Sequence, residues 1–330
     1  TAIGRILPSG RNATVEALAV HLAMTGGRPE YMPVMIAITR AMLDPRFRLH
    51  MMQATTCSSS IAAIVHGPIS KQIRMNPEYG CLGPHPGYPA GGRIGRAIHL
   101  MLQDIGEAYP GTVCMANFGG PQKWANVFFA EDEDGVPEGW TTLGEDRGFE
   151  KGVNAVTIHA IASSTNITSL DAGDEQSCYE TLLYYARMLN GDYGNILTNY
   201  SEESSPGIIV MPRGIANGIA RAGWSKEAVK QFLWENSKYQ WSVVSTDSHL
   251  LKRTENTVQK WFPEGEPWPV CFKPEQLMIV VAGGKQSGHG YYMRMGCCTL
   301  GPVSTTIELP PNWDALIAAA NDDLGPALEI

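Results

Sequence analysis

Three segments of the chain gather residue types that could carry out chemistry. The first is residues 55–60, TTCSSS, which follow an apolar stretch that the pattern predicts to be a strand. Strand ends are where α/β folds place their sites. If a nearby cation or helix end lowers its pKa, Cys57 can act as a nucleophile or metal ligand, with Thr55 and Thr56 contacting a substrate. A polar turn with a buried cysteine would explain the same residues.

The second segment is residues 80–92, GCLGPHPGYPAGG, which we expect to be a shaped loop because its glycines and prolines break regular structure. It carries Cys81 as a candidate nucleophile, and Gly83 and His85 as candidate substrate contacts. A helix beginning near Arg93 would present unpaired N–H groups, which favour an anion. The spacing matches no nucleotide-binding fingerprint. A purely structural loop is the alternative.

The third segment is residues 283–290, GGKQSGHG, after the apolar stretch MIVVA. Lys285 and the backbone at Gly284 are expected to hold an anion, while His289 moves protons. Ser287 with His289 would suit a hydrolase that needs neither thiol nor metal. A flexible hairpin with solvated Lys285 and His289 is the structural alternative.

The cysteines indicate a reducing compartment. There are 7, without any C-x-x-C pair, so we expect a cytoplasmic protein rather than a disulfide framework. Cys297 and Cys298 are adjacent, and adjacent residues on a strand point to opposite faces, so a joint metal or redox role is not favoured. The remaining histidines lack metal-ligand spacing, and the sequence assigns no metal or cofactor.

Composition limits the class of protein. The chain has 330 residues, 44% of them hydrophobic, so it can bury a sizeable core as one large domain or as two closely packed halves with a boundary near residues 131–150. With a net charge of −8 and no basic cluster, a nucleic-acid partner is not expected. The apolar runs are shorter than the ~20 residues that cross a bilayer, so no membrane span is expected.

The elements that must position these residues alternate along the chain. Residues 14–25 and 29–43 predict an amino-terminal helical hairpin, and mixed strands and helices follow, so the predicted class is mixed α/β. The acidic stretch 131–139 predicts an exposed excursion. The predicted strands are 50–56, 61–67, 124–132, 153–162, 207–212, 275–284, 290–296 and 303–310, and the later helices are 93–106, 175–189, 226–239 and 311–324.

The chain resembles the large component of the UGSC family, named for a selenocysteine-Gly-Ser-Cys motif. The resemblance lies in TVEALAVHLAMTGGRPEYMPVMIAITRAML, QATTCSSSIAAIVHGPISKQIRMN and IGRAIHLML, and extends to GWSKEAVKQFLWENS and IVVAGG. The family name implies thiol or selenol redox chemistry, but this chain has neither selenocysteine nor Cys-Gly-Ser-Cys. The resemblance therefore implies a redox centre on a separate subunit, or other chemistry in this branch. The residues carried over as shapers of a shared site are Thr55, Thr56, Gly67, Pro68 and the Gly83-Pro84 turn.

We therefore expect an enzyme that acts on a small organic acid or a thiol-containing metabolite, by thiol, redox or lyase-type chemistry. One alternative is a non-catalytic or substrate-binding subunit whose reactive centre is on another chain, and another is a metal-free hydrolase. A small-molecule substrate is the expected partner, with a partner subunit or homo-oligomer open. Thr1 could be a processed nucleophile, although trimming would leave the same first residue.

Overall fold

The structure is a computed structural model that describes residues 1–168, 172–191 and 193–325. It begins with a β-hairpin, β1 (Ala2–Ile6) and β2 (Arg11–Thr14), which the sequence analysis did not predict. The predicted helical hairpin follows as α1 (Val15–Met24) and α2 (Met32–Met42). The Thr14 hydroxyl accepts a hydrogen bond from the Ala17 N–H at 3.1 Å, which caps α1.

A seven-stranded mixed sheet runs through the molecule, which confirms the predicted α/β class. Its strand order is β4-β3-β5-β8-β6-β7, and β9 pairs with β5. β3 and β4 are parallel, and so are β6 and β7, while the central strands β5 and β8 are antiparallel to their neighbours. The strands are β3 (Ser60–His66), β4 (Val127–Ala130), β5 (Ala155–Thr168), β6 (Gly207–Met211), β7 (Met278–Val281), β8 (His289–Met295) and β9 (Val303–Thr306).

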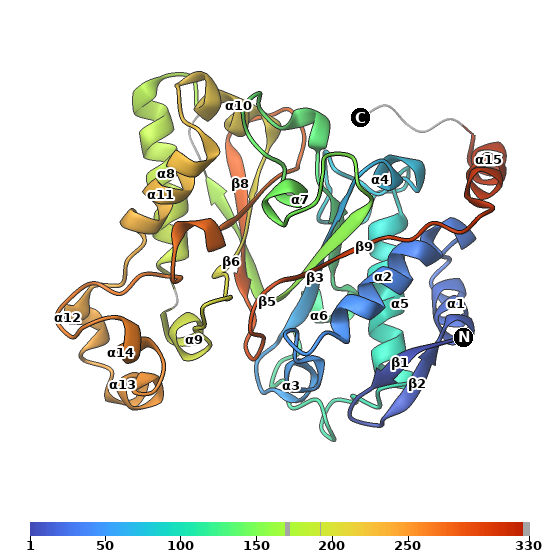
Figure 1. Cartoon of the computed structure of the whole chain (residues 1–330), viewed down its shortest axis with the longest axis horizontal. Coiled ribbons are helices and arrows are strands. Elements are labelled where there is room, and N and C mark those ends of the chain that lie inside the picture. Colours follow the sequence, from blue (N-terminus) through green and yellow to red (C-terminus); the bar gives the residue numbers. More distant parts are fainter. Residues whose placement is uncertain (169–171, 192, 326–330) are drawn as a thin grey trace.

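Helices flank the sheet at both ends of the molecule (Figure 1). Within the described residues, no helix is long and apolar enough to cross a membrane. The remaining helices are α3 (Leu49–Ala54), α4 (Ile69–Gln72), α5 (Ala90–Asp104), α6 (Pro121–Ala125), α7 (Leu143–Asp146), α8 (Glu175–Leu189), α9 (Tyr193–Thr198), α10 (Arg213–Arg221), α11 (Lys226–Asn236), α12 (Trp241–Val244), α13 (Ser248–Thr254), α14 (Val258–Trp261) and α15 (Trp313–Leu324).

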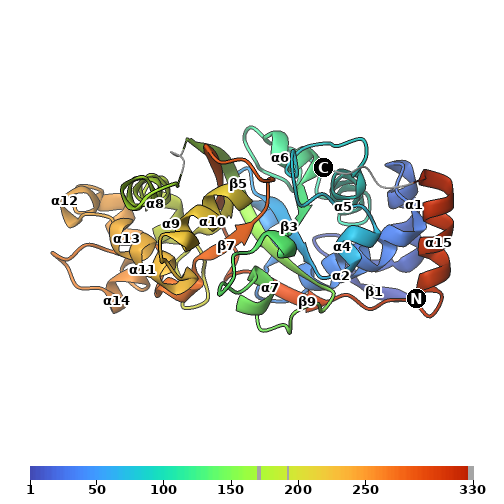
Figure 2. The ribbon, with the colours of Figure 1, turned by 90° about the horizontal axis from the view of Figure 1, so that it is seen from above.

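Alternation along the strands divides the core into three clusters. In β3, Ile61 and Val65 pack under α1, α2, α5 and α15, while Ile64 faces the other side of the sheet. In the carboxy-terminal half, β6 and β7 pack their outer faces against α8, α10 and α11. The two inner faces share one cluster, because the sheet curls on itself. Seen from above, the helical layers lie at opposite ends of an elongated molecule (Figure 2).

Three predictions about elements are wrong. Residues 50–56 do not form a strand, because α3 occupies Leu49–Ala54. The predicted loop 80–92 is shorter than expected, since α5 already begins at Ala90. The acidic stretch 131–139 is not simply an exposed excursion, because Glu131 and Asp132 are only 3% and 4% exposed. The Asp132 N–H donates to the Val281 carbonyl at 2.8 Å, which joins the ends of β4 and β7.

Candidate functional site

Cys57 lies at the amino end of β3, not after a strand as expected. Ser60, the first residue of β3, pairs with Ile161 of β5, and Ile161 in turn pairs with Met295, the last residue of β8. The turn after β8 therefore comes next to the segment before β3. This register brings Cys297 and Cys298 to Cys57 from the far end of the chain.

Three cysteines and two hydroxyls form what we call the thiol cluster: Cys57, Cys297, Cys298, Thr55 and Ser59. The Sγ atoms of Cys297 and Cys298 are 3.0 Å apart. The Thr55 hydroxyl is 2.9 Å from the Cys297 sulfur. The Ser59 hydroxyl lies 3.5 Å from the sulfur of Cys57 and 3.6 Å from that of Cys297. Cys57 and Cys298 are partly exposed, so a small molecule can reach the cluster.

The argument against a joint role for Cys297 and Cys298 is wrong, because the pair does not lie on a strand. β8 ends at Met295, and the Gly296 N–H turns to the Ala160 carbonyl at 2.7 Å. Cys298 then adopts a φ of 81°, in the left-handed region that side chains rarely occupy. Its N–H donates to the Asn199 side-chain oxygen at 2.8 Å, which holds this strained turn and lets the adjacent sulfurs meet.

The hydrogen bonds within the cluster separate the three thiols by acidity. The hydrogen bond with Cys297 stabilises the Cys298 thiolate, and with help from Thr55 it lowers the pKa of Cys298 to about 7. The same hydrogen bond raises the pKa of Cys297. A hydrogen bond with Cys297, followed by burial, raises the pKa of Cys57. Near neutral pH Cys298 is therefore ionised in part, beside two protonated thiols.

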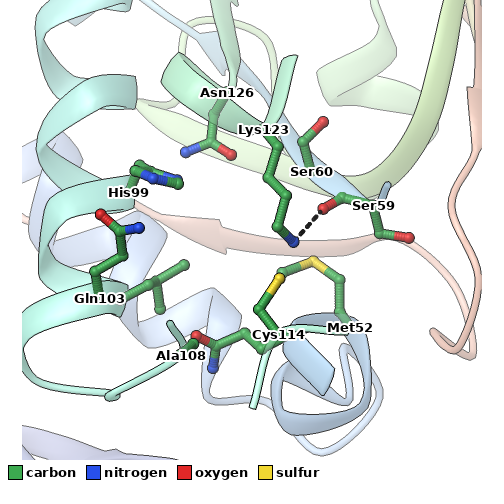
Figure 3. Close-up of a pocket in the computed structure, with 11 residues that line it drawn as sticks. Met52, Ser59, Ser60, His99, Gln103, Ala108, Cys114, Lys123 and Asn126 are labelled. Atoms are coloured by element: carbon green, nitrogen blue, oxygen red, sulfur yellow. Dashed lines mark hydrogen bonds between the residues drawn. The ribbon is translucent and has the colours of Figure 1, made fainter. Parts of the chain in front are cut away.

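A small cavity with polar and apolar lining residues, shown in Figure 3, shares Ser59 with the thiol cluster. Lys123 extends into it and donates to the Ser59 carbonyl at 3.1 Å, which ties α6 to the residue before β3. The volume of ≈ 30 Å³ suits a water molecule and not an organic substrate. Burial, together with the cations Arg96 and Lys123, lowers the pKa of His99 in this cavity to about 4. His99 is therefore neutral at physiological pH.

The two glycine-rich loops meet at the other end of the sheet. The Gly283 N–H donates to the Pro77 carbonyl at 2.9 Å, and both loops line a cavity of ≈ 230 Å³. Cys81, Gly83 and His289 all line it. Burial raises the pKa of Cys81 to about 12, so its thiol is protonated at neutral pH, which does not favour the expected role as a nucleophile. The Asn166 amide lies 3.1 Å from the His289 Nδ1.

The other expected contacts are spread around this end. His85 lines a neighbouring cavity of ≈ 540 Å³ that also includes Gly83. Lys285 is exposed and lies outside the lining of both cavities. The Gly284 carbonyl accepts from the Arg213 N–H at 2.9 Å, which is a structural role. Ser287 is partly buried in the same loop.

The single site expected from the three segments is therefore divided between two ends of the sheet. Thr55 and Cys57 lie in the thiol cluster, while Thr56 is exposed and its carbonyl accepts from the Asn117 N–H at 3.2 Å. β8 separates this end from the glycine-rich loops by its own length, from His289 to Met295, which is ~20 Å at the usual rise of a strand. Chemistry at one end cannot use side chains from the other.

A group of three side chains that the sequence analysis missed, two of them buried, joins β3, β4 and α7. Ligand atoms of His66, Glu131 and Glu133 lie within 4.8 Å of one another, a set that could hold a metal ion. The Glu131 carboxylate already accepts from the His66 Nδ1 at 2.8 Å and from the N–H groups of Leu143 and Gly144 at 2.6 and 3.3 Å. This group caps α7. His66 ends β3 and Glu131 directly follows β4, and these two strands pair in parallel. Polar residues at the ends of two such strands are the signal that could have identified this group.

No protein-family model matches the chain, and no curated protein or solved structure matches it significantly. The resemblance to the UGSC family therefore stays a prediction.

Proposed function

We propose that the chain is a thiol-dependent oxidoreductase that exchanges electrons with a small thiol or disulfide metabolite at the thiol cluster. The observation that carries the proposal is the 3.0 Å separation of the Cys297 and Cys298 sulfurs, with Cys57 next to them. Two thiols this close can be oxidised together.

The reaction begins with the Cys298 thiolate, whose pKa of about 7 leaves it ionised in part at neutral pH. It attacks one sulfur of a small disulfide, so a bond forms from the Cys298 sulfur, the substrate S–S bond breaks, and one substrate thiolate leaves with a proton from solvent. Cys297 then loses its proton and attacks the Cys298 sulfur, which releases the second substrate thiol. The protein pair is oxidised to a disulfide, and the substrate disulfide is reduced to two thiols.

The geometry of the pair makes this disulfide easy to reverse. Adjacent Cα atoms lie ~3.8 Å apart across a trans peptide, whereas disulfides usually join Cα atoms ~4.4–6.8 Å apart. A disulfide between Cys297 and Cys298 is therefore strained, and strained disulfides are readily reduced. A small dithiol could return the pair to its reduced form. The cluster suits a centre that cycles between two states.

A single-turnover experiment tests the proposal. The reduced protein is freed of reductant and mixed with excess glutathione disulfide, and the released thiol is counted. We expect about two thiols per chain from the unaltered protein, none above background from C298S, and one from C297S, which should hold half of the substrate on Cys298. The C81A variant, changed at the other end of the sheet, is the control and should behave as the unaltered protein does.

Two results would count against the proposal. If C298S releases thiol at the full rate, the attacking sulfur is elsewhere. If the unaltered chain forms no mixed disulfide at all, its sulfurs do not react, and the alternative of a non-catalytic subunit takes precedence.

A further inference from the structure

The two cavities at the glycine-rich end adjoin each other and form what we call the double cavity. Leu82 and Gly83 line both the ≈ 540 Å³ part and the ≈ 230 Å³ part. Each volume approaches or lies within the range of small-molecule sites, which are ~300–1,000 Å³. The ≈ 230 Å³ part lies at the opposite end of β8 from the thiol cluster, while the ≈ 540 Å³ part extends to Asn126, which also lines the small cavity near that cluster. No residue of the thiol cluster lines either part, so the double cavity is a separate site.

The charge of the lining points to an anion. Arg93 is the one fully charged side chain among the lining residues, which also include the imidazoles of His85 and His289. No carboxylate lines either part, although the chain carries a net charge of −8. Within the described part of the chain, the Arg93 guanidinium has no ion-pair partner. The Nε and Cζ atoms of Arg93 lie beside Gly26, and a cation without an ion-pair partner in the lining of a cavity is matched by a ligand carboxylate.

The remaining walls point to an apolar body. Much of the lining of the larger part consists of side chains without polar groups, and Asn126 adds one amide. The apolar side chains are Leu82, Pro84, Pro86, Pro89, Val127 and Phe128. One cation and an apolar wall suit a ligand with one negative charge and a hydrocarbon or aromatic body. A nucleotide or sugar phosphate carries more charge than one arginine can neutralise, so the lining does not favour it.

Glycines in α5 explain how Arg93 comes to line the larger part of the double cavity. A Cβ on Gly91 would lie 2.1 Å from the Phe128 carbonyl oxygen, and one on Gly95 would lie 2.2 Å from that of Ala125. These glycines let the first turns of α5 pack directly against β4 and the residues before it. At Gly92 a Cβ would meet nothing within 4 Å, so this face of the helix is open to the cavity.

We propose that the double cavity binds a small monocarboxylic acid with an apolar body, with its carboxylate on Arg93 and its body against the wall of prolines, Val127 and Phe128. The proposal replaces the expected anion contact at Lys285 with one at Arg93. It adds a binding site that is separate from the thiol cluster.

Calorimetric titration with phenylacetate tests this site, with the neutral phenylacetamide and inorganic phosphate as comparison ligands. We expect phenylacetate to bind, and both comparison ligands to bind at least ~10-fold more weakly, since one charge-assisted contact contributes about that factor. R93Q should lower the affinity for phenylacetate by a similar factor. K285Q removes an exposed cation outside the cavity and should leave the affinity unchanged.

A second variant tests the site independently, in case R93Q does not fold. G92L places a side chain in the open space and should block phenylacetate while leaving every charge in place. The proposal would be overturned if phenylacetamide or phosphate bound as tightly as phenylacetate, or if phenylacetate did not bind at all. It would also be overturned if R93Q or G92L bound phenylacetate with unchanged affinity. C298S should bind phenylacetate normally, so failure here is distinct from failure of the redox proposal.

Discussion

Cys298 differs from other cysteines of the chain in both its backbone and its hydrogen bonds. It sits at a φ of 81°, and its pKa is lowered to about 7 by the hydrogen bond with Cys297. Cys81 and Cys271, in contrast, are buried among apolar side chains that raise their pKa values. Strained backbone of this kind is concentrated at functional sites in proteins. At the scale of single residues, reactivity is therefore expected at Cys298.

The Thr55 hydroxyl should help to keep the pKa of Cys298 low. This hydroxyl lies 2.9 Å from the Cys297 sulfur and also helps to lower the pKa of Cys298. T55V removes that hydroxyl at nearly constant volume, so we expect the pKa of Cys298 to rise towards the ordinary thiol value of ~8.5. The measurement is ultraviolet absorbance of the thiolate against pH. T56V changes the exposed neighbouring threonine and should leave the titration where it was.

The sequence predicted Cys57 but not its partners, and the reason is local. The polar run 55–60 marks Cys57 as a candidate by composition alone. Cys297 and Cys298 were set aside because residues on a strand alternate. Gly296 and the Gly301-Pro302 pair, which flank them, are the turn signals that could have shown that the strand stops first.

At the scale of elements, two glycines in α5 should respond oppositely to the same change. G95A places a Cβ 2.2 Å from a carbonyl oxygen, so we expect it to lower the free energy of unfolding by ~1–3 kcal/mol. G92A meets no atom within 4 Å, and because alanine favours helix it should raise that free energy by up to ~1 kcal/mol. Urea unfolding measures both. Similar effects of the two changes would show that close packing on β4 does not govern this helix.

Elements with strong periodicity or clear caps were predictable, and short apolar runs were not. The helix capped by Ser225 is present as α11, with the Ala228 N–H donating to the Ser225 hydroxyl at 3.2 Å. Residues 50–56 were read as a strand because a short apolar run has no clear period. They form α3 because Leu49 and Met52 are one helical turn apart and both face the core.

At the scale of the whole molecule, an ion pair holds the ends of the curled sheet together. Arg213, after β6, contacts the carboxylate of Asp132, after β4, through two hydrogen bonds of 2.7 and 2.8 Å. R213Q would leave a carboxylate that is 4% exposed without its cation, so we expect a loss of ~3–5 kcal/mol in the free energy of unfolding.

K71Q is the matched control for that prediction. It breaks the Lys71–Asp134 ion pair, whose side chains are 65% and 69% exposed. We expect this change to lower the free energy of unfolding by no more than ~1 kcal/mol. Chemical denaturation compares the two variants. A small effect of R213Q, comparable to that of K71Q, would mean that the pair does not join the two halves.

The strand order and register of the whole sheet could not be predicted from the sequence. Each half has two parallel strands beside a central antiparallel one, β3 and β4 beside β5, and β6 and β7 beside β8. No repeat in the sequence shows this, because apolar strands of the same pattern can pair in many orders. The register of β5 decides that residues 55–60 face one end of the sheet and residues 283–290 the other. The expected division near residues 131–150 stays a prediction.

The most direct test of the account is the alkylation rate of each cysteine in the native protein as a function of pH, mapped by peptide mass spectrometry. We predict that Cys298 reacts fastest, with a midpoint near its pKa of about 7 and a rate that falls as the pH drops below it, because the thiolate is lost. Cys81 should stay unreactive throughout, since burial raises its pKa to about 12. A Cys298 midpoint at the ordinary value of ~8.5, or a faster reaction at any other cysteine, would contradict the account.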